Sequence, residues 1–171
     1  MNNCSEFVLD DLMAVTAVPV GNIPASLPAS PANSLLPTIS ASGFSPSLTG
    51  AITIGQKPAV QGGALVPIKR FTGKAKDDES DSVAGRLHTV SVTCEVDGRD
   101  SSADSGGKRI WDYLLQLERG TYHLLLTFRD GVTRAFVSAS EDTYLFNAER
   151  DGSKTTVTFR IQNLMGIQLI V

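Results

Sequence analysis

The sequence predicts a mainly β protein, built as an antiparallel β-sandwich or partly open barrel with one flanking helix and an extended N-terminal arm. All eight prolines lie at or before Pro67, so the later chain lacks the residue that most strongly opposes a central strand. That later region alternates apolar and polar residues and contains Asp-Gly turns, which is typical of antiparallel strands. We therefore divide the chain into a Pro/Ala/Ser-rich arm, residues 1–63, and a β-sandwich body with one helix, residues 64–171.

The arm combines low charge with bulky apolar side chains. Residues 5–20 mix apolar and acidic side chains, and this pattern leaves a short helix and a docking strand both open. Prolines recur through residues 24–63 and oppose both a helix and a central strand. Exposing the apolar side chains of this region to water is unfavourable. We therefore expect a partner to cover the arm, and the predicted interface residues are Leu35, Leu36, Ile39, Phe44, Leu48, Ile52 and Ile54.

The sequence of the first half of the body predicts a long hairpin. Ala64–Thr72 reads as a strand that Pro67 interrupts early, and Lys74–Asp81, with two lysines and four acids, reads as a charged loop. Leu87–Val96 has the cleanest alternation in the chain, with His88 and four apolar residues at alternate positions. We expect the two strands to pair, with the charged loop at the tip of the hairpin.

The sequence of the second half of the body predicts one helix followed by several strands. A Gly/Ser/Asp-rich loop, Asp97–Gly107, comes first. Apolar residues then recur at helical spacing over residues 108–119, and Gly120 ends this helix. Trp111 lies on the apolar stripe and is expected to anchor the core. Asp-Gly turns join the strands that follow, which we expect at Tyr122–Phe128, Val132–Ala139, Thr143–Glu149, Thr155–Ile161 and Leu164–Val171.

No motif for catalysis or for metal binding stands out. His88 and His123 are the only histidines, and the sequence near them supplies no nucleophile or carboxylate in a catalytic arrangement. The acids of Asp97–Asp104 lack the order of a calcium loop, and the Gly-Lys pairs lack the spacer of a phosphate loop. We expect no enzyme, no cofactor and no metal, and a hydrolase that uses either histidine is the least favoured alternative.

Charge and cysteine content exclude further classes. The net charge is −3 and the chain has no basic run, which disfavours sequence-specific nucleic-acid binding. Cys4 and Cys94, one in each half, predict neither a disulfide framework nor a zinc site. The N-terminus lacks the positive start of a signal peptide, and Met13–Val20 is too short to span a bilayer. We therefore expect a soluble protein with no membrane partner.

The order of elements in residues 64–171 resembles the tail-tube family of phage and contractile-injection proteins. Leu87–Val96 and Ile110–Leu117 match best, and Thr127–Gly131 and Ile161–Gly166 are similar to segments of phage structural proteins. The resemblance implies a small β-sandwich that forms rings, typically hexameric, with hairpin strands lining a lumen and arms latching onto adjacent rings. On this basis we expect residues of the predicted hairpin to lie at an interface or lumen: Lys74, Lys76, Asp77, Asp78, Glu79, Thr89, Ser91, Thr93 and Glu95.

We therefore expect a non-enzymatic virion structural protein, a self-assembling subunit of a phage tail tube or neck. The proline-rich arm departs from a typical tube subunit and keeps neck, terminator and other connector roles open. Its partners would be further copies, in a ring or stacked rings, and other virion proteins, assembled in the bacterial host cytoplasm. The alternative is a monomeric β-sandwich binding module of the adhesin or carbohydrate-binding type, but aromatic residues form only 6% of the chain and lie mostly at apolar-face positions.

Overall fold

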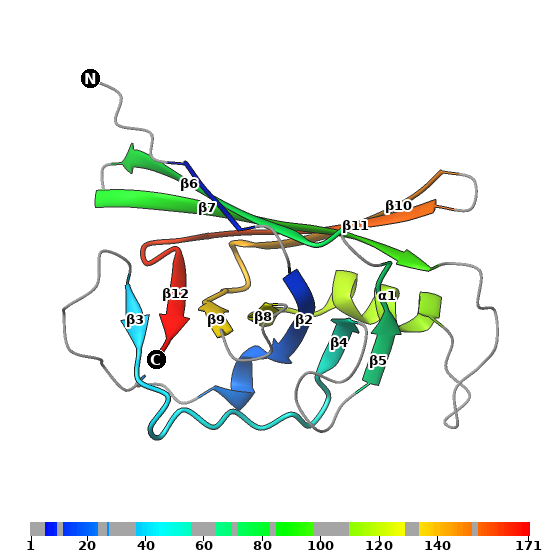
Figure 1. The fold of residues 1–171 in the computed structure, drawn as a ribbon, viewed down its shortest axis with the longest axis horizontal. Helices are drawn as coiled ribbons and strands as arrows, with labels where there is room; N and C mark the ends of the chain where they lie inside the picture. Colours follow the sequence, from blue (N-terminus) through cyan, green and yellow to red (C-terminus); the bar gives the residue numbers. More distant parts are fainter. Residues whose placement is uncertain are drawn as a thin grey trace.

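The computed structural model describes residues 6–9, 12–23, 27, 37–55, 64–69, 72–82, 85–97, 110–128, 134–151 and 154–171. Within these residues the fold is mainly β, with two sheets and one helix (Figure 1). The two sheets pack face to face around a common core. This arrangement confirms the β-sandwich and the single flanking helix that the sequence predicts.

The first sheet has five strands, all antiparallel to their neighbours. Its longest strand is β7, which pairs along most of its length with β6 on one side and β11 on the other. In spatial order the strands are β1 (Glu6–Leu9), β6 (Lys74–Ser82), β7 (Gly85–Asp97), β11 (Lys154–Asn163) and β10 (Tyr144–Asp151).

The second sheet has seven strands and is mixed. The pairs β3–β12 and β4–β5 are parallel, and the other neighbours are antiparallel. In spatial order the strands are β3 (Thr38–Ile39), β12 (Ile167–Ile170), β9 (Arg134–Val137), β8 (Tyr122–Phe128), β2 (Leu12–Pro19), β4 (Ile52–Gly55) and β5 (Ala64–Pro67). A short 3-10 helix, η1 (Val20–Asn22), follows β2.

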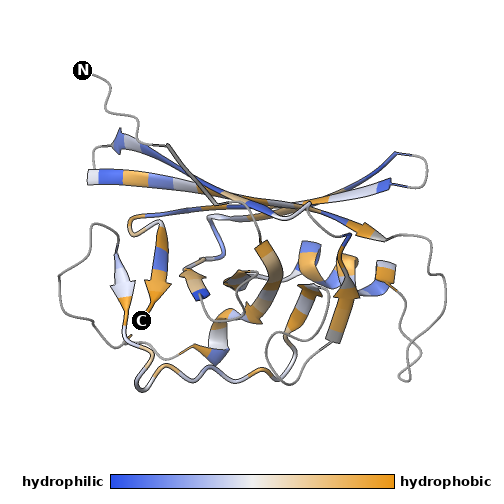
Figure 2. Cartoon of the chain, in the orientation of Figure 1, coloured by the Kyte–Doolittle hydropathy of each residue, from blue (hydrophilic) through white to orange (hydrophobic). Residues whose placement is uncertain are grey.

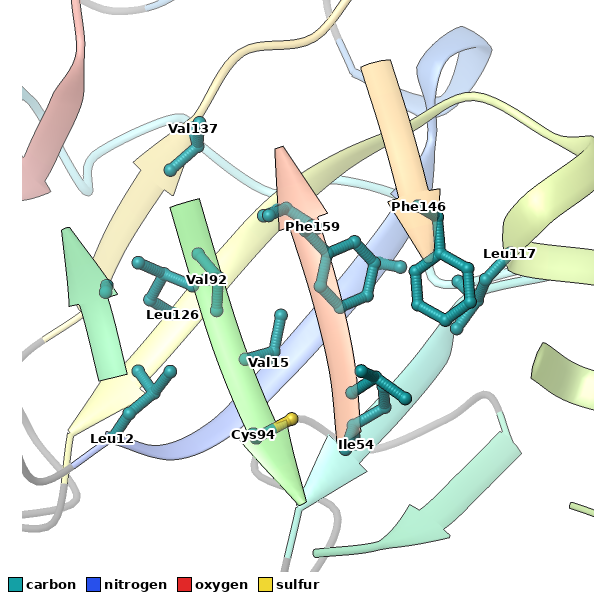
Figure 3. Close-up of a cluster of buried hydrophobic side chains, with 14 of the residues drawn as sticks. Leu12, Val15, Ile54, Val92, Cys94, Leu117, Leu126, Val137, Phe146 and Phe159 are labelled. Carbon is teal, nitrogen blue, oxygen red and sulfur yellow. The ribbon is translucent and has the colours of Figure 1, made fainter. Parts of the chain in front are cut away.

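The main core lies between the sheets. Alternate residues of β7 point into it and are buried, as period-two geometry requires of a half-buried strand. Figure 3 shows Val92 and Phe159 of the five-stranded sheet packed with Val15 and Leu126 of the seven-stranded sheet. Cys94 belongs to the same cluster, and burial raises the pKa of its thiol to about 12. This cysteine is therefore an apolar core residue rather than a reactive thiol.

The helix, α1 (Ile110–Arg119), packs next to β10 and adds Leu114 and Leu117 to the main core. Tyr144 of β10 donates a hydrogen bond from its hydroxyl to the Leu117 carbonyl at 2.8 Å. Burial raises the pKa of Tyr144, so this hydroxyl stays protonated and able to donate. Asp112 in the first turn and Arg119 in the last turn oppose the helix dipole.

A second, smaller core covers the other face of the seven-stranded sheet. Val18, Leu125 and Phe136 point away from the five-stranded sheet, and residues 39–51 fold over them. Phe44 contacts Phe136 edge-on, with ring centroids 5.4 Å apart. In Figure 1 this segment runs in cyan along the lower side of the sheet. Since both faces of β8 are covered, all but the first of its residues are buried.

The predicted division at residue 63 needs correction, because strands of the arm are integral to the body. β2 lies in the middle of the seven-stranded sheet between β8 and β4. Its alternation is hidden in the sequence because both faces of this strand are buried. The prolines do not prevent these strands, since Pro19 is the last residue of β2 and Pro46 and Pro58 lie outside β4.

The predicted long hairpin also needs correction. The charged segment expected as a loop is strand β6, and it pairs residue by residue with β7. The segment expected to be its partner contributes β5, which lies in the other sheet beside β4. β6 shows little apolar alternation because it is so polar. Among its residues that point toward the core, only Ala75 is a buried apolar residue. Figure 2 shows this hydrophilic character along β6, against the hydrophobic strands of the seven-stranded sheet.

The remaining elements follow the predictions closely. β8 has the predicted bounds, and β7, β9, β10, β11, β12 and α1 differ from theirs only at the ends. The turn predicted at residues 130–131 lies outside the described residues, and of the turn predicted at residues 151–152 only Asp151 is described, as the last residue of β10. The pairs β8–β9 and β10–β11 are antiparallel hairpins.

Candidate interaction surfaces

The five-stranded sheet turns one face away from the core, and none of the described elements packs on it (Figure 1). We call this surface the outer face. Its side chains are exposed or half-buried, and most of them are polar or charged, with Leu87 and Leu145 as the apolar exceptions. The outer face includes Lys74, Lys76, Asp78, Ser80, Leu87, Thr89, Ser91, Thr93, Glu95, Leu145, Asn147, Glu149, Asp151, Lys154, Thr156, Thr158, Arg160 and Gln162.

The strand register orders these side chains in rows across the sheet. One row runs from Lys74 through Thr93 and Thr158 to Asn147, with each residue directly opposite the next. In this row short hydroxyl side chains occupy the two middle strands and longer polar side chains the flanks, whereas Glu95 and Arg160 place charges on the middle strands. Such a face is well hydrated, and it offers hydrogen-bonding groups at regular strand spacing.

Glu95 forms the main charge cluster of the outer face. Its carboxylate lies 2.9 Å from the Lys154 ammonium and 3.7 Å from the Lys69 ammonium. The hydrogen bond from Lys154 lowers the pKa of Glu95 against the opposing effect of desolvation, and the same bond raises the pKa of Lys154. These exposed pairs hold the side chains in place but contribute little to stability.

Seven of the nine predicted hairpin residues lie together on the outer face, and Asp77 and Glu79 do not. Their positions on β6 direct them to the opposite side, where Glu79 pairs with Arg86 at 2.8 Å. Asp77 accepts a hydrogen bond from the Ile167 amide at 3.1 Å and contacts the Nδ1 atom of His88 at 2.9 Å. Asp77 therefore joins the two sheets where the chain passes from β11 to β12.

The pairing of His88 with a carboxylate was missed in the sequence because β6 was read as a loop. Gly166 lies against the Asp77–His88 pair. It has a φ of +65°, and its amide donates a hydrogen bond to the Asn163 side chain at 2.5 Å. A Cβ atom at Gly166 would collide with Asp77 and His88, so the backbone of this turn fills the space above the pair. The arrangement suits a structural clasp, since a general base needs room for a substrate beside it.

His123 is held in the protein interior. Its Nδ1 atom accepts a hydrogen bond from the Ala139 amide at 2.8 Å, and its ring contacts Phe136. Burial lowers the pKa of His123, against the opposing effect of a hydrogen bond with the Val20 backbone. A neutral imidazole whose acceptor nitrogen is already occupied is a poor general base. Among the residues described, no group of three or more His, Cys, Asp or Glu is placed to hold a metal ion.

An open hollow of about 550 Å³ lies beside α1. Leu115, on its wall, is 43% exposed, and the neighbouring Trp111 is 38% exposed. The expectation that Trp111 anchors the core is wrong, because Leu114 and Leu117 take the inward positions of the helix. The hollow is lined by Asp112, Leu115, Gln116, Arg119, Gly120 and Tyr122.

The predicted arm interface is covered by the chain itself. Leu48 is half-buried, and four others are buried in the two cores, so they need no partner to shield them: Ile39, Phe44, Ile52 and Ile54. Leu35 and Leu36 lie outside the described residues.

In the part of the chain that the structure describes, no helix combines the length and the apolar character needed to cross a membrane. Compared with known proteins, the chain matches no family model, no curated protein and no solved structure.

Proposed function

We propose that this chain is a non-enzymatic virion structural protein, a self-assembling subunit of a phage tail tube or neck. The observation that carries the proposal is the outer face. It is a largely polar face made by long strands, and a packed core supports it from behind. Repeated around a ring, such faces would form a continuous hydrated wall, while the rest of each sandwich would be available for contacts between copies.

The surroundings of the two histidine side chains also support a structural role. The space beside His88 is filled by Gly166, and the acceptor nitrogen of His123 is occupied by the Ala139 amide. Both histidines hold parts of the fold together, and a general base needs a free acceptor within reach of a substrate.

The way in which copies would attach differs from the expected arm latch. Residues 39–51 cover the chain's own sheet, and Ile52 and Ile54 lie within that sheet on β4, so these apolar side chains are already buried or half-buried. Contacts with further copies, and with other virion proteins, would therefore use sheet edges and exposed loops. Assembly would take place in the bacterial host cytoplasm, and the product would reside in the virion.

The direct test is the solution mass of the purified full chain, measured by light scattering over a concentration series. The proposal expects a discrete multiple of 18.2 kDa, or growth into polymers, with rings or tubes visible by electron microscopy. A mass of 18.2 kDa at every concentration would contradict self-assembly.

One observation favours a second candidate, a monomeric β-sandwich binding module. Trp111 is 38% exposed next to the hollow beside α1, and an exposed tryptophan is suited to stacking on a sugar ring. This candidate expects a monomer that binds on a glycan array, and it expects Trp111→Ala to abolish the signal. Leu164→Ala is the control, because Leu164 is also an exposed apolar residue, whereas Phe44→Ala would change a buried side chain.

A further inference from the structure

The edges of the two sheets differ greatly in length. Three of the four edge strands, β1, β3 and β5, have two to four residues, and β5 ends at Pro67. Short strands and prolines are common protections against unwanted pairing at a sheet edge. β6 extends beyond β1 by Lys74 at one end and by Glu79–Ser82, which carries two acids, at the other. β10, with eight residues, is the one long edge among the described strands.

The hydrogen bonds of β10 show which backbone groups point outward. The Thr143 carbonyl accepts from the Gln162 amide of β11 at 3.3 Å, whereas the Tyr144 amide donates to Ser140. Because hydrogen-bonded and non-hydrogen-bonded pairs alternate along antiparallel strands, odd-numbered residues of β10 bond to β11. The N–H and C=O groups of Phe146 and Ala148 therefore point toward the outer edge, where no described strand pairs with them.

The side chains on this edge are also unusual for a surface strand. Tyr144–Ala148 carries no charge, and Leu145 is 64% exposed, more than any other large apolar residue described. An edge strand with an uncharged stretch and an exposed apolar side chain promotes association. The adjoining helix presents Trp111 and Leu115, so exposed apolar groups occur on both neighbouring elements.

We propose that the outer edge of β10 pairs antiparallel with the same edge of a second copy of this chain, about a two-fold axis. The partner must use the same strand because no other described edge has comparable length, and a surface that pairs with itself gives a closed two-fold contact. The proposal does not rest on a virion role, since a binding module could pair in the same way.

Charge narrows the register of this pairing. A two-fold axis at Glu149 or Arg150 would place like charges directly opposite each other, which is unfavourable. An axis at Asn147 or Ala148 avoids this conflict and also pairs the greatest length of β10, because these two residues lie at its middle. In these two registers Leu145 lies opposite the partner's Glu149 or the partner's Asp151.

The test compares paired variants of the full chain by light scattering. Ala148→Pro removes an outward N–H without removing a bond to β11, and Ala148→Ser keeps that N–H. Leu145→Glu places a negative charge opposite an acid in either register, and Leu145→Lys places a positive charge there. The wild type, Ala148→Ser and Leu145→Lys should have twice the 18.2 kDa mass or an even multiple of it, and the other two variants should lose the pair.

Each result decides the question. A wild-type chain that remains at 18.2 kDa overturns this inference together with self-assembly. A self-associating wild type whose mass is unchanged in Leu145→Glu overturns this inference and leaves self-assembly standing. Leu145 is exposed, so this variant gives an answer even where Ala148→Pro does not fold.

Cross-linking identifies the strands in contact. Opposite Cα atoms of an antiparallel pair are about 4.5–5.5 Å apart, within the range that a disulfide can bridge. In a Cys4→Ser background, Asn147→Cys or Ala148→Cys should give a covalent dimer on oxidation, and the exposed Glu141→Cys should not. Cys94 is buried and does not interfere. If neither β10 variant cross-links, or Glu141→Cys does so equally, pairing through β10 is excluded.

Discussion

His123 connects β8 to the backbone after β9, and its protonation should affect folding. Burial lowers the pKa of His123 below its usual value of about 6.5, so the unfolded chain binds this proton more readily than the folded chain does. The stability that depends on neutral His123 is therefore complete above about pH 6.5 and is lost as the pH falls through the folded-state pKa.

His123→Gln keeps a hydrogen-bond acceptor but cannot titrate in this range. We expect the free energy of unfolding of the wild type to fall more steeply between about pH 7.5 and 5 than that of the variant, as measured by denaturant titration. Parallel pH profiles for the two proteins would show that His123 is not responsible.

Gly166 should be the least replaceable of the glycines with positive φ. Its φ of +65° disfavours a side chain, and a Cβ atom there would also collide with Asp77 and His88. Gly166→Ala should lower the free energy of unfolding by roughly 2–5 kcal/mol, through backbone strain and overpacking together. Gly43→Ala is the matched control, because Gly43 has a φ of +82° with open space around it and should lose only about 1–2 kcal/mol. Equal losses in thermal or denaturant unfolding would refute the clasp.

At the scale of the element, residues 39–51 should behave as a cover fastened by Phe44. This side chain is 8% exposed and packs against Phe136, so Phe44→Ala should lower the free energy of unfolding by roughly 3–5 kcal/mol. Native-state proteolysis should cut the variant within this segment before the rest of the chain unfolds. Ser45→Ala, at an exposed neighbouring position, should change neither measurement. A cut pattern identical to that of the wild type would argue against the cover.

The predictability of each strand depended on how it is buried. β7 and β11 have one face in the core and one face open, and their residues alternate clearly. β2 is covered on both faces and β6 is polar on nearly all of its length, so neither shows the alternation that identifies a strand. The Asp77–His88 contact depends on the β6–β7 register and was therefore inaccessible from periodicity alone.

For the whole molecule, the N-terminal segment should be required for folding. Deleting residues 1–63 removes β2 and β4 from the middle of the seven-stranded sheet and uncovers β8. We expect the truncated chain to lose its cooperative thermal unfolding, whereas deleting residues 1–5 should preserve it. A truncated chain that unfolds cooperatively but no longer assembles would instead restore the arm latch that the sequence suggested.

The amino-acid sequence by itself determined the mainly β class, the single helix and most strands of the second half of the chain. These features follow from local periodicity and turn residues, which record whether one face of a segment is buried. The tertiary structure alone decided that β2 and β4 belong to the sandwich, that residues 39–51 cover its second face, and that β10 is left as a long edge. The physical reason is that burial and strand pairing join residues far apart in the chain, and the pattern within one segment does not specify which distant segment will cover it.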